Sequence, residues 1–220
     1  MHAGGALASW QVGSREDALA AAEAGCDFIS AQGIGASGHV RGTIGVLALL
    51  DEVLAAVDIP VLAAGGIGSG RALAAVLAAG ADGARIGTRF LGAEQAETHP
   101  DYLKALLATR PHDTVYTQVF SVNWPNAPHR VLSSSIAAAE AFQGATVGEF
   151  IDRYTGEREV IPRFQVLGAS RDASRAVGAV PLWAGESVGA VRRVQPAGEI
   201  VRELSEEAEA LLCRWSTARG

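Results

Sequence analysis

One repeating unit organises residues 1–95: a short apolar strand, then a polar or glycine-rich loop, then a helix. Strands that alternate with helices are joined by right-handed crossovers, which produce a parallel sheet. Each expected strand is apolar almost throughout, as is typical of a sheet buried on both faces. The pattern therefore predicts an α/β fold with a parallel sheet. The expected strands are residues 7–12, 26–32, 61–64 and 83–90.

Signals for the start and end of helices support this division. Ser14 is expected to cap a helix, with Asp17 three residues on as its capping-box partner, and Gly25 ends that helix. Ser69 and Gly80 are expected to begin and end a later helix in the same way. The expected helices are residues 18–24, 46–57 and 71–79.

The rhythm of the sequence changes after Pro100. Helices are expected over residues 101–110, 135–142 and 199–215, an extended segment over 114–120, and irregular segments over 123–129 and 168–189. This half contains no internal repeat, and no clean linker separates it from the first half. We therefore expect one domain over residues 1–220, with barrel-type units in 1–95 and a mostly helical extension in 96–220.

Composition and charge argue against several classes of protein. The net charge is -6 and Lys and Arg form no run, so binding to nucleic acid or to an anionic membrane surface is not expected. No apolar stretch is long enough to span a membrane. Cys26 and Cys213 make neither a disulfide framework nor a metal pair, and reduced thiols are typical of a cytoplasmic protein. The sequence shows no metal-binding histidine motif or carboxylate cluster, so no catalytic metal is expected.

Two glycine-centred strand ends, Gly65-Gly66 and Gly87-Thr88, predict a phosphate site. Glycine lets the backbone approach an anion, and a following helix N-terminus offers N–H groups and a positive dipole end. Thr88 adds a hydroxyl donor. In β/α-barrels the loops after the last two strands often hold a phosphate together. The alternative is that these glycines only make tight turns between strand and helix.

A third glycine-rich loop, residues 32–39, also follows an expected strand and ends in His39. Such a loop suits backbone contact with a flat ligand. His39 can take a proton near neutral pH, or stabilise an anion when it is charged. The alternative is an exposed loop histidine with no catalytic role. The other histidines have no matching context and are expected at the surface or in packing: His2, His99, His112 and His129.

Taken together, these motifs resemble the FMN-dependent nitronate monooxygenases. The resemblance lies in residues 31–33, 38–39, 60–67 and 87–91, and in a tail at 181–185 that is followed by Gly189. It implies a (β/α)8 barrel that oxidises alkyl nitronates with molecular oxygen and holds FMN by its phosphate at the last two strands. It also implies that His39 acts as base or holds the anionic substrate. The implied cofactor-binding residues are Gln32, Ser37, Gly65, Gly66, Arg85, Ile86, Gly87 and Thr88.

Two departures from that family stand out. The loop that commonly reads Glu-Ala-Gly-Gly-His is here Gly35-Ala36-Ser37-Gly38-His39, so the acid is missing. Only four strand–helix units precede Arg89, whereas a barrel needs eight. Four strands would leave two open edges and an uncovered apolar inner face. We expect an incomplete TIM barrel of about four C-terminal βα units with a helical extension, either N-terminally truncated or completed by another chain, such as a second copy.

Three functional hypotheses remain open at the level of sequence. The first is FMN-dependent oxidation of a small nitronate or nitroalkane by O2. The second is an enzyme similar to the FMN-dependent enoyl-[acyl-carrier-protein] reductases, whose loops are closely similar. The third is an inactive truncated fragment, or a half-barrel that only associates with another chain.

Overall fold

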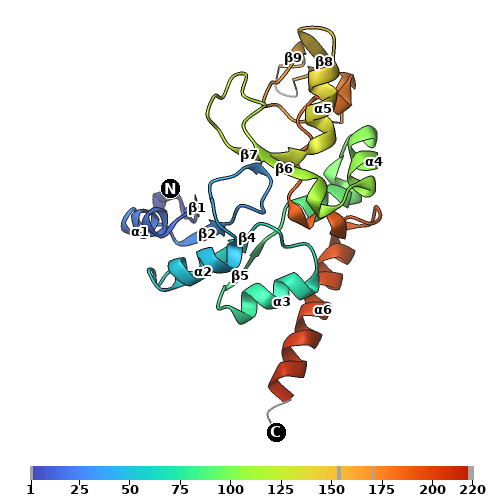
Figure 1. Ribbon diagram of the computed structural model, residues 1–220. Coiled ribbons are helices and arrows are strands. Elements are labelled where there is room, and N and C mark those ends of the chain that lie inside the picture. Colours follow the sequence, from blue (N-terminus) through green and yellow to red (C-terminus); the bar gives the residue numbers. More distant parts are fainter. Residues whose placement is uncertain (1, 153–154, 170, 218–220) are drawn as a thin grey trace. The chain divides into compact units, whose positions relative to one another are not determined.

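The computed structural model describes residues 2–152, 155–169 and 171–217, and contacts along the chain divide them into two compact units (Figure 1). The first unit takes residues 2–36, 40–87 and 198–217, and the second takes 37–39 and 88–197. That these units form the one domain expected from the sequence stays a prediction. The division arises because residues 37–39 pair with strands that lie much later in the chain.

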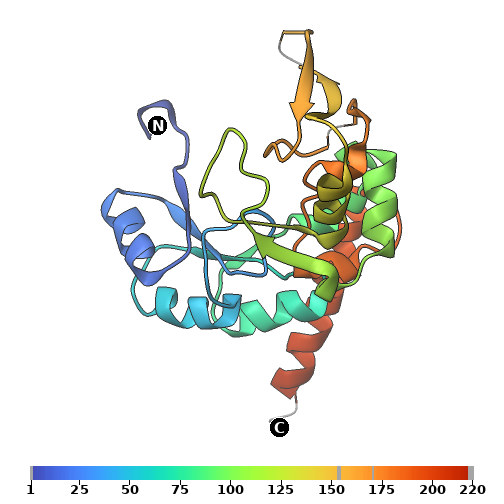
Figure 2. The same cartoon turned by 45° about the horizontal axis from the view of Figure 1, so that its top comes forward.

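In the described part of the first unit, four parallel strands form a sheet in the order β1-β2-β4-β5, which confirms the predicted α/β class. Both views show α2 and α3 along the same face of this sheet (Figures 1 and 2). The strands are β1 (Ser9–Val12), β2 (Phe28–Gln32), β4 (Val61–Ala64) and β5 (Gly83–Arg85). The helices are α1 (Arg15–Glu23), α2 (Val46–Leu54), α3 (Gly70–Ala78) and α6 (Ala197–Thr217), and η1 (His2–Gly4) is a short 3-10 turn.

The core of the first unit lies between the sheet and its helices. Alternate strand residues face the helices, because successive side chains of a strand point to opposite faces. The other face is mixed: it carries the polar side chains of Gln11, Ser30, Gln32 and Arg85 together with the apolar side chains of Phe28, Leu62 and Ala64. The expectation of an apolar inner face is therefore met only in part. The buried residues of the core are Val12, Ala18, Ala21, Ile29, Ala31, Leu49, Leu50, Val53, Val61, Ala63, Ile67, Val76 and Ala81.

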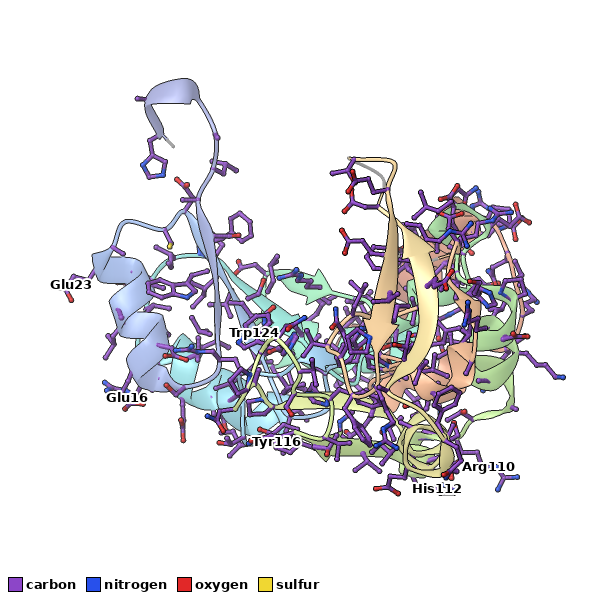
Figure 3. All side chains as sticks on the ribbon, turned by 90° about the horizontal axis from the view of Figure 1, so that it is seen from above. Glu16, Glu23, Arg110, His112, Tyr116 and Trp124 are labelled. Carbon is purple, nitrogen blue, oxygen red and sulfur yellow. The ribbon has the colours of Figure 1, made fainter. Side chains whose placement is uncertain are left out.

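The predicted N-caps Ser14 and Ser69 are confirmed, but the Asp17 carboxylate accepts the Gly13 N–H at 3.0 Å and not the Ser14 N–H of a capping box. The Ser14 hydroxyl accepts the Asp17 N–H at 3.1 Å, and the Ser69 hydroxyl accepts the Ala72 N–H at 3.2 Å. Gly25 and Gly80 follow the helix ends with φ of 78° and 102°, a left-handed conformation that disfavours other residues. Figure 3 shows Glu16 and Glu23 pointing outward from α1.

The strand predicted over residues 83–90 ends early, at Arg85. After Gly87 the chain forms a 3-10 turn, η2 (Thr88–Gly92), instead of continuing the strand. The Thr88 hydroxyl forms a hydrogen bond with the Ser37 hydroxyl and accepts one from the Gly185 N–H. These distant partners, which local sequence does not reveal, hold residue 88 in the turn.

The described residues of the second unit contain two antiparallel sheets. One sheet has the order β3-β7-β6 and another the order β10-β8-β9. Among the described residues of 96–217, helices still cover more positions than strands, so these sheets interrupt the predicted helical extension and do not replace it. Strand segments such as 146–151 contain β-branched and aromatic residues that suit a sheet. The strands are β3 (Gly38–His39), β6 (Thr114–Thr117), β7 (His129–Leu132), β8 (Thr146–Ile151), β9 (Arg158–Pro162) and β10 (Ser174–Arg175).

Helices and short turns complete the second unit. Its core is formed by large buried side chains, among them Phe120, Leu132 and Ile161. The helices are α4 (Pro100–Ala108) and α5 (Ser133–Ala141), with 3-10 turns η3 (Glu94–Ala96), η4 (Pro111–Asp113), η5 (Val177–Ala179) and η6 (Glu186–Ala190). No helix within the described residues is long and apolar enough to cross a membrane.

Within the first unit, α6 meets α3 at Gly70. A Cβ atom built on Gly70 would lie 2.4 Å from the Cβ of Glu207 and 2.7 Å from the carbonyl oxygen of Leu204. The Gly70 N–H also donates to Glu207 Oε2 at 2.8 Å. The absence of a side chain at residue 70 therefore allows the two helices to approach at backbone distance.

We expect Gly70→Ala to destabilise the protein by about 1–3 kcal/mol, because the new methyl group collides with backbone and Cβ atoms that cannot yield. Gly198→Ala is the matched control, since a Cβ there meets nothing within 4 Å. Alanine in a helix should leave stability unchanged or raise it by roughly 0.5–1 kcal/mol. The free energy of unfolding in urea measures both. Equal effects of the two substitutions would contradict the close helix crossing.

Candidate functional site

The carboxyl edge of the parallel sheet brings together six of the predicted cofactor-binding residues. Gln32 lies opposite Ala64 on the neighbouring strand, and Ala64 lies opposite Arg85. The segments that follow these three residues therefore leave the sheet side by side. The residues gathered there are Gln32, Gly65, Gly66, Arg85, Ile86 and Gly87.

Glycine is structurally required in the first of these loops. Gly65 and Gly66 have φ of 106° and 74°, which L side chains rarely adopt. A Cβ on Gly65 would lie 2.9 Å from the Ala36 nitrogen and the Gly33 oxygen. At Gly87 a Cβ would instead meet nothing within 4 Å. Open backbone beside a tight glycine turn is a surface that a phosphate group fits.

The helix that follows this loop contributes less than predicted. The first amide of α3, from Gly70, already donates to Glu207, and the Ala72 amide donates to the Ser69 hydroxyl. The expected free N–H groups at this helix start are therefore in use. The second loop leads only into the short η2 turn. Any anion contact thus depends on the glycine loops more than on the helix dipole.

Gln32 at the end of β2 is buried and holds the adjacent loop in place. Its Oε1 accepts the Arg41 N–H at 2.7 Å. The Arg41 guanidinium in turn forms a bidentate pair with Asp17, at 2.8 and 2.6 Å. Hydrogen bonding to Arg41 lowers the pKa of Asp17, so the pair stays charged. These contacts anchor the loop that follows β2.

Arg85 reaches across the sheet. Its Nη1 donates to Gln11 Oε1 at 3.1 Å, although β5 and β1 are the two outer strands. Three strand spacings of a flat sheet amount to about 14 Å. The contact shows that the face away from the helices is concave. A strongly curved parallel sheet is the form that β/α-barrel strands take.

The other three predicted site residues, Ser37, His39 and Thr88, belong to the second unit. Thr88 is only 4% exposed. Its Oγ1 lies 3.0 Å from Ser37 Oγ and accepts the Gly185 N–H at 3.0 Å. The hydroxyl predicted to serve as a ligand donor thus joins the two loops that carry Ser37 and Gly185.

His39 sits in an aromatic cluster. Its ring centroid lies 4.1 Å from that of Trp124 and 5.6 Å from that of Trp183. The β3–β7 pairing places His129 directly opposite His39, with the two ring centroids 6.0 Å apart. Figure 3 marks Trp124, which lies on the segment between β6 and β7. His39 is therefore half-buried and not exposed, while its catalytic role stays a prediction.

Sequence reasoning missed two members of this cluster. Trp124 fell in a segment predicted only as irregular, and His129 was expected at the surface or in packing. His129 is fully buried, in agreement with the packing reading, but its place beside His39 was not predicted. Local sequence held no signal for either contact, because the pairing joins residues that lie far apart in the chain.

Hydrogen bonds from separate elements fix the loop that carries Trp183. The Leu132 N–H donates to the Leu182 carbonyl at 2.9 Å, and the Tyr102 hydroxyl donates to the Trp183 carbonyl. The Gly185 N–H is held by Thr88. Burial raises the pKa of Tyr102, which keeps its donor proton in place. The Trp183 ring is thus held firmly within the cluster.

Burial lowers the pKa of His39 below its ordinary value of 6.5, and the neighbouring His129 lowers it further. Burial also lowers the pKa of His129, partly offset by its hydrogen bond to Ala127. Both rings are therefore mainly neutral near pH 7. A neutral His39 can accept a proton, which favours the role of base over that of a charged anion holder. The described residues contain no group of three or more side chains placed to hold a metal ion.

We expect Thr88→Val to lower the free energy of unfolding by about 1–3 kcal/mol, because the buried Gly185 N–H loses its acceptor. Thr88→Ser keeps the hydroxyl and should cost less. Urea unfolding of the flavin-free protein compares the two. A valine variant as stable as the serine variant would show that the hydroxyl does not secure this loop.

We also expect the His39 imidazole to titrate below pH 6.5, which NMR of the ring Cε1–H can follow. The sign for stability follows: an unfolded chain binds more protons than the folded one just below pH 6.5, so stability falls as pH decreases through this range. A midpoint for His39 above 6.5 would contradict the desolvated environment.

Comparison with known proteins assigns this chain to a family. A sequence profile of the family described as "Nitronate monooxygenase" matches residues 1–207. A nitronate monooxygenase from Neurospora crassa is 34% identical over 220 residues, which is 95% of this chain and 56% of that protein. The chain spans about half the length of the curated relatives it matches.

Solved structures agree with this assignment. A nitroalkane oxidase from Streptomyces ansochromogenes superposes with a TM-score of 0.70 at 29% identity, covering 100% of this chain and 61% of that one. A mutant of FabK from Thermotoga maritima gives 0.71 at 25% identity, covering 96% and 61%. Both are TIM-barrel enzymes. The chain belongs to the nitronate monooxygenase family, which is a family of flavin-dependent enzymes.

Proposed function

We propose that this chain takes part in the oxidation of alkyl nitronates by molecular oxygen, with FMN as cofactor. The observation that carries the proposal is His39, a histidine that burial keeps neutral within a fixed aromatic cluster. A neutral imidazole can accept the proton on the carbon next to a nitro group, which gives the nitronate. When neutral it can also donate one hydrogen bond to a nitronate oxygen.

The phosphate of FMN would be held by Gly65, Gly66 and Gly87, with Ile86 and Arg85 beside them. Their fit rests on the left-handed glycine turn and on the open backbone at Gly87. We propose that Gln32, Ser37 and Thr88 contact the cofactor as well. A bound FMN would supply the redox chemistry that carries electrons from the substrate to O2. The chain's own residues would bind it, orient the substrate and move the proton.

We further propose that the four parallel strands represent about four βα units of a TIM barrel. The concave face and the contact between Arg85 and Gln11 support this. Closure of the barrel would then require strands in addition to the four described here. The open outer strands β1 and β5 are where such strands would pair.

A second candidate is an activity like that of the FMN-dependent enoyl-[acyl-carrier-protein] reductases. The structural likeness to FabK, with a TM-score of 0.71, is the observation that favours it. A neutral His39 is compatible with either activity, because a proton must be moved in both. The two candidates differ in the electron donor and acceptor, so one assay separates them.

The experiment is a flavin titration followed by two assays. We expect FMN to bind, seen as a change in its absorbance, and O2 consumption to follow addition of propyl-2-nitronate. NADH oxidation that requires an enoyl thioester, without nitronate oxidation, would support the second candidate instead. If titration with FMN yields no flavin-bound protein, both candidate functions are overturned. His39→Gln should bind FMN like the native chain but lose activity with the nitroalkane.

We expect Gly65→Ala to weaken FMN binding by roughly 10-fold to 100-fold, since loss of charge-assisted N–H bonds costs about 1.5–3 kcal/mol. The Cβ would strain a backbone at φ 106° and press on Ala36. Riboflavin, which lacks the phosphate, should be affected much less. Gly198→Ala is the control. Equal weakening of FMN and riboflavin would place the defect outside the phosphate loop.

A further inference from the structure

His129 lies where it can control the position of His39. The antiparallel pairing of β3 and β7 sets the two residues directly opposite each other, which puts their side chains on the same face. Their ring centroids are 6.0 Å apart, with the rings nearly perpendicular at 76°. The next residue on β7, Arg130, directs its guanidinium to Thr114 and to Glu186 at 3.3 Å. His129 is thus the β7 side chain that faces His39.

Both nitrogens of His129 are occupied. Nδ1 lies 2.9 Å from the Ala127 carbonyl, and Nε2 receives the Phe120 N–H at 3.4 Å. A carbonyl only accepts, so Nδ1 must carry the proton, and Nε2 must then be bare to accept from an amide. The ring is neutral in this arrangement, and it has no nitrogen left for a substrate. A direct part for His129 in proton transfer is therefore disfavoured.

The His129 ring also contacts Trp183. Their centroids are 5.3 Å apart at an angle of 87°, and Trp183 lies 5.6 Å from His39. The three rings therefore touch one another in a triangle. Phe120 adds a fourth ring, 6.0 Å from His129. Hydrogen bonds at both nitrogens fix the orientation of the His129 ring. The rings of His39 and Trp183 pack against it.

We propose that His129 is a positioning residue, which holds His39 and Trp183 in their working orientation through its fixed neutral ring. This rests on the proposed function only in so far as His39 is the base. Protonation of His129 would set two N–H groups against each other at Phe120 and place a second charge beside His39.

The test begins with the native protein. Nitrogen-15 NMR of the histidine rings should show His129 protonated at Nδ1 and bare at Nε2 at pH 7–8. A His129 that carries its proton on Nε2, or that becomes charged within this range, would overturn the proposal. This measurement needs neither a variant nor bound flavin, so it stands even if no nitronate is oxidised.

The second arm uses His129→Phe, which keeps the ring and removes both hydrogen bonds, and His129→Asn, which keeps a donor for Ala127. With FMN bound, we expect kcat for the nitroalkane to fall roughly 10-fold to 100-fold in the phenylalanine variant, while KM changes little. The asparagine variant should lie between it and the native protein. The His39 ring signals should shift in both, with the midpoint of His39 moving toward 6.5.

His112→Phe is the matched control, because His112 lies in the same unit with an exposed side chain. It should change neither kcat nor the His39 signals. Thermal unfolding of each variant checks that it is folded. Folded His129 variants with native kcat and native His39 signals would overturn the proposal. If the native protein oxidises no nitronate, the proposed function fails, while the NMR arm still decides the part played by His129.

Discussion

Parallel pairing of β1, β2, β4 and β5 is the constraint on which the first unit depends. It sends one set of alternating side chains into the helices and leaves the other set on a concave face. It also sends every loop that follows a strand out of the same edge. The register that aligns Gln32, Ala64 and Arg85 therefore makes the two glycine loops neighbours. A phosphate-sized anion would therefore bind to two loops whose positions are fixed by the register of the sheet.

In the second unit, pairing between distant segments fixes the position of His39. A two-residue strand, β3, pairs with β7 far along the chain and carries His39 into a set of aromatic rings. Hydrogen bonds from Tyr102, Thr88 and β7 fix the Trp183 loop. The result is a half-buried histidine that is desolvated by aromatic rings which are themselves held in place.

Local rules in the sequence predicted the first unit well and the second poorly. Strand periodicity, the Ser14 and Ser69 caps and the left-handed Gly25 and Gly80 all depend on residues a few positions apart, and all are confirmed. The strand predicted over 83–90 is present but ends at Arg85, and the predicted helical extension over 96–220 is interrupted by two antiparallel sheets. Both depended on partners distant in sequence, which propensity cannot supply.

The sequence by itself determined the α/β class, the glycine turns, and the presence of His39 after a parallel strand, because each follows from backbone sterics or short-range periodicity. Only the tertiary structure decided what those residues contact. It engaged the first amide of α3 with Glu207, bound the Thr88 hydroxyl to Gly185, and set buried His129 opposite His39. These contacts arise from strand pairing and helix packing between segments up to 137 residues apart, where a single sequence carries no local signal.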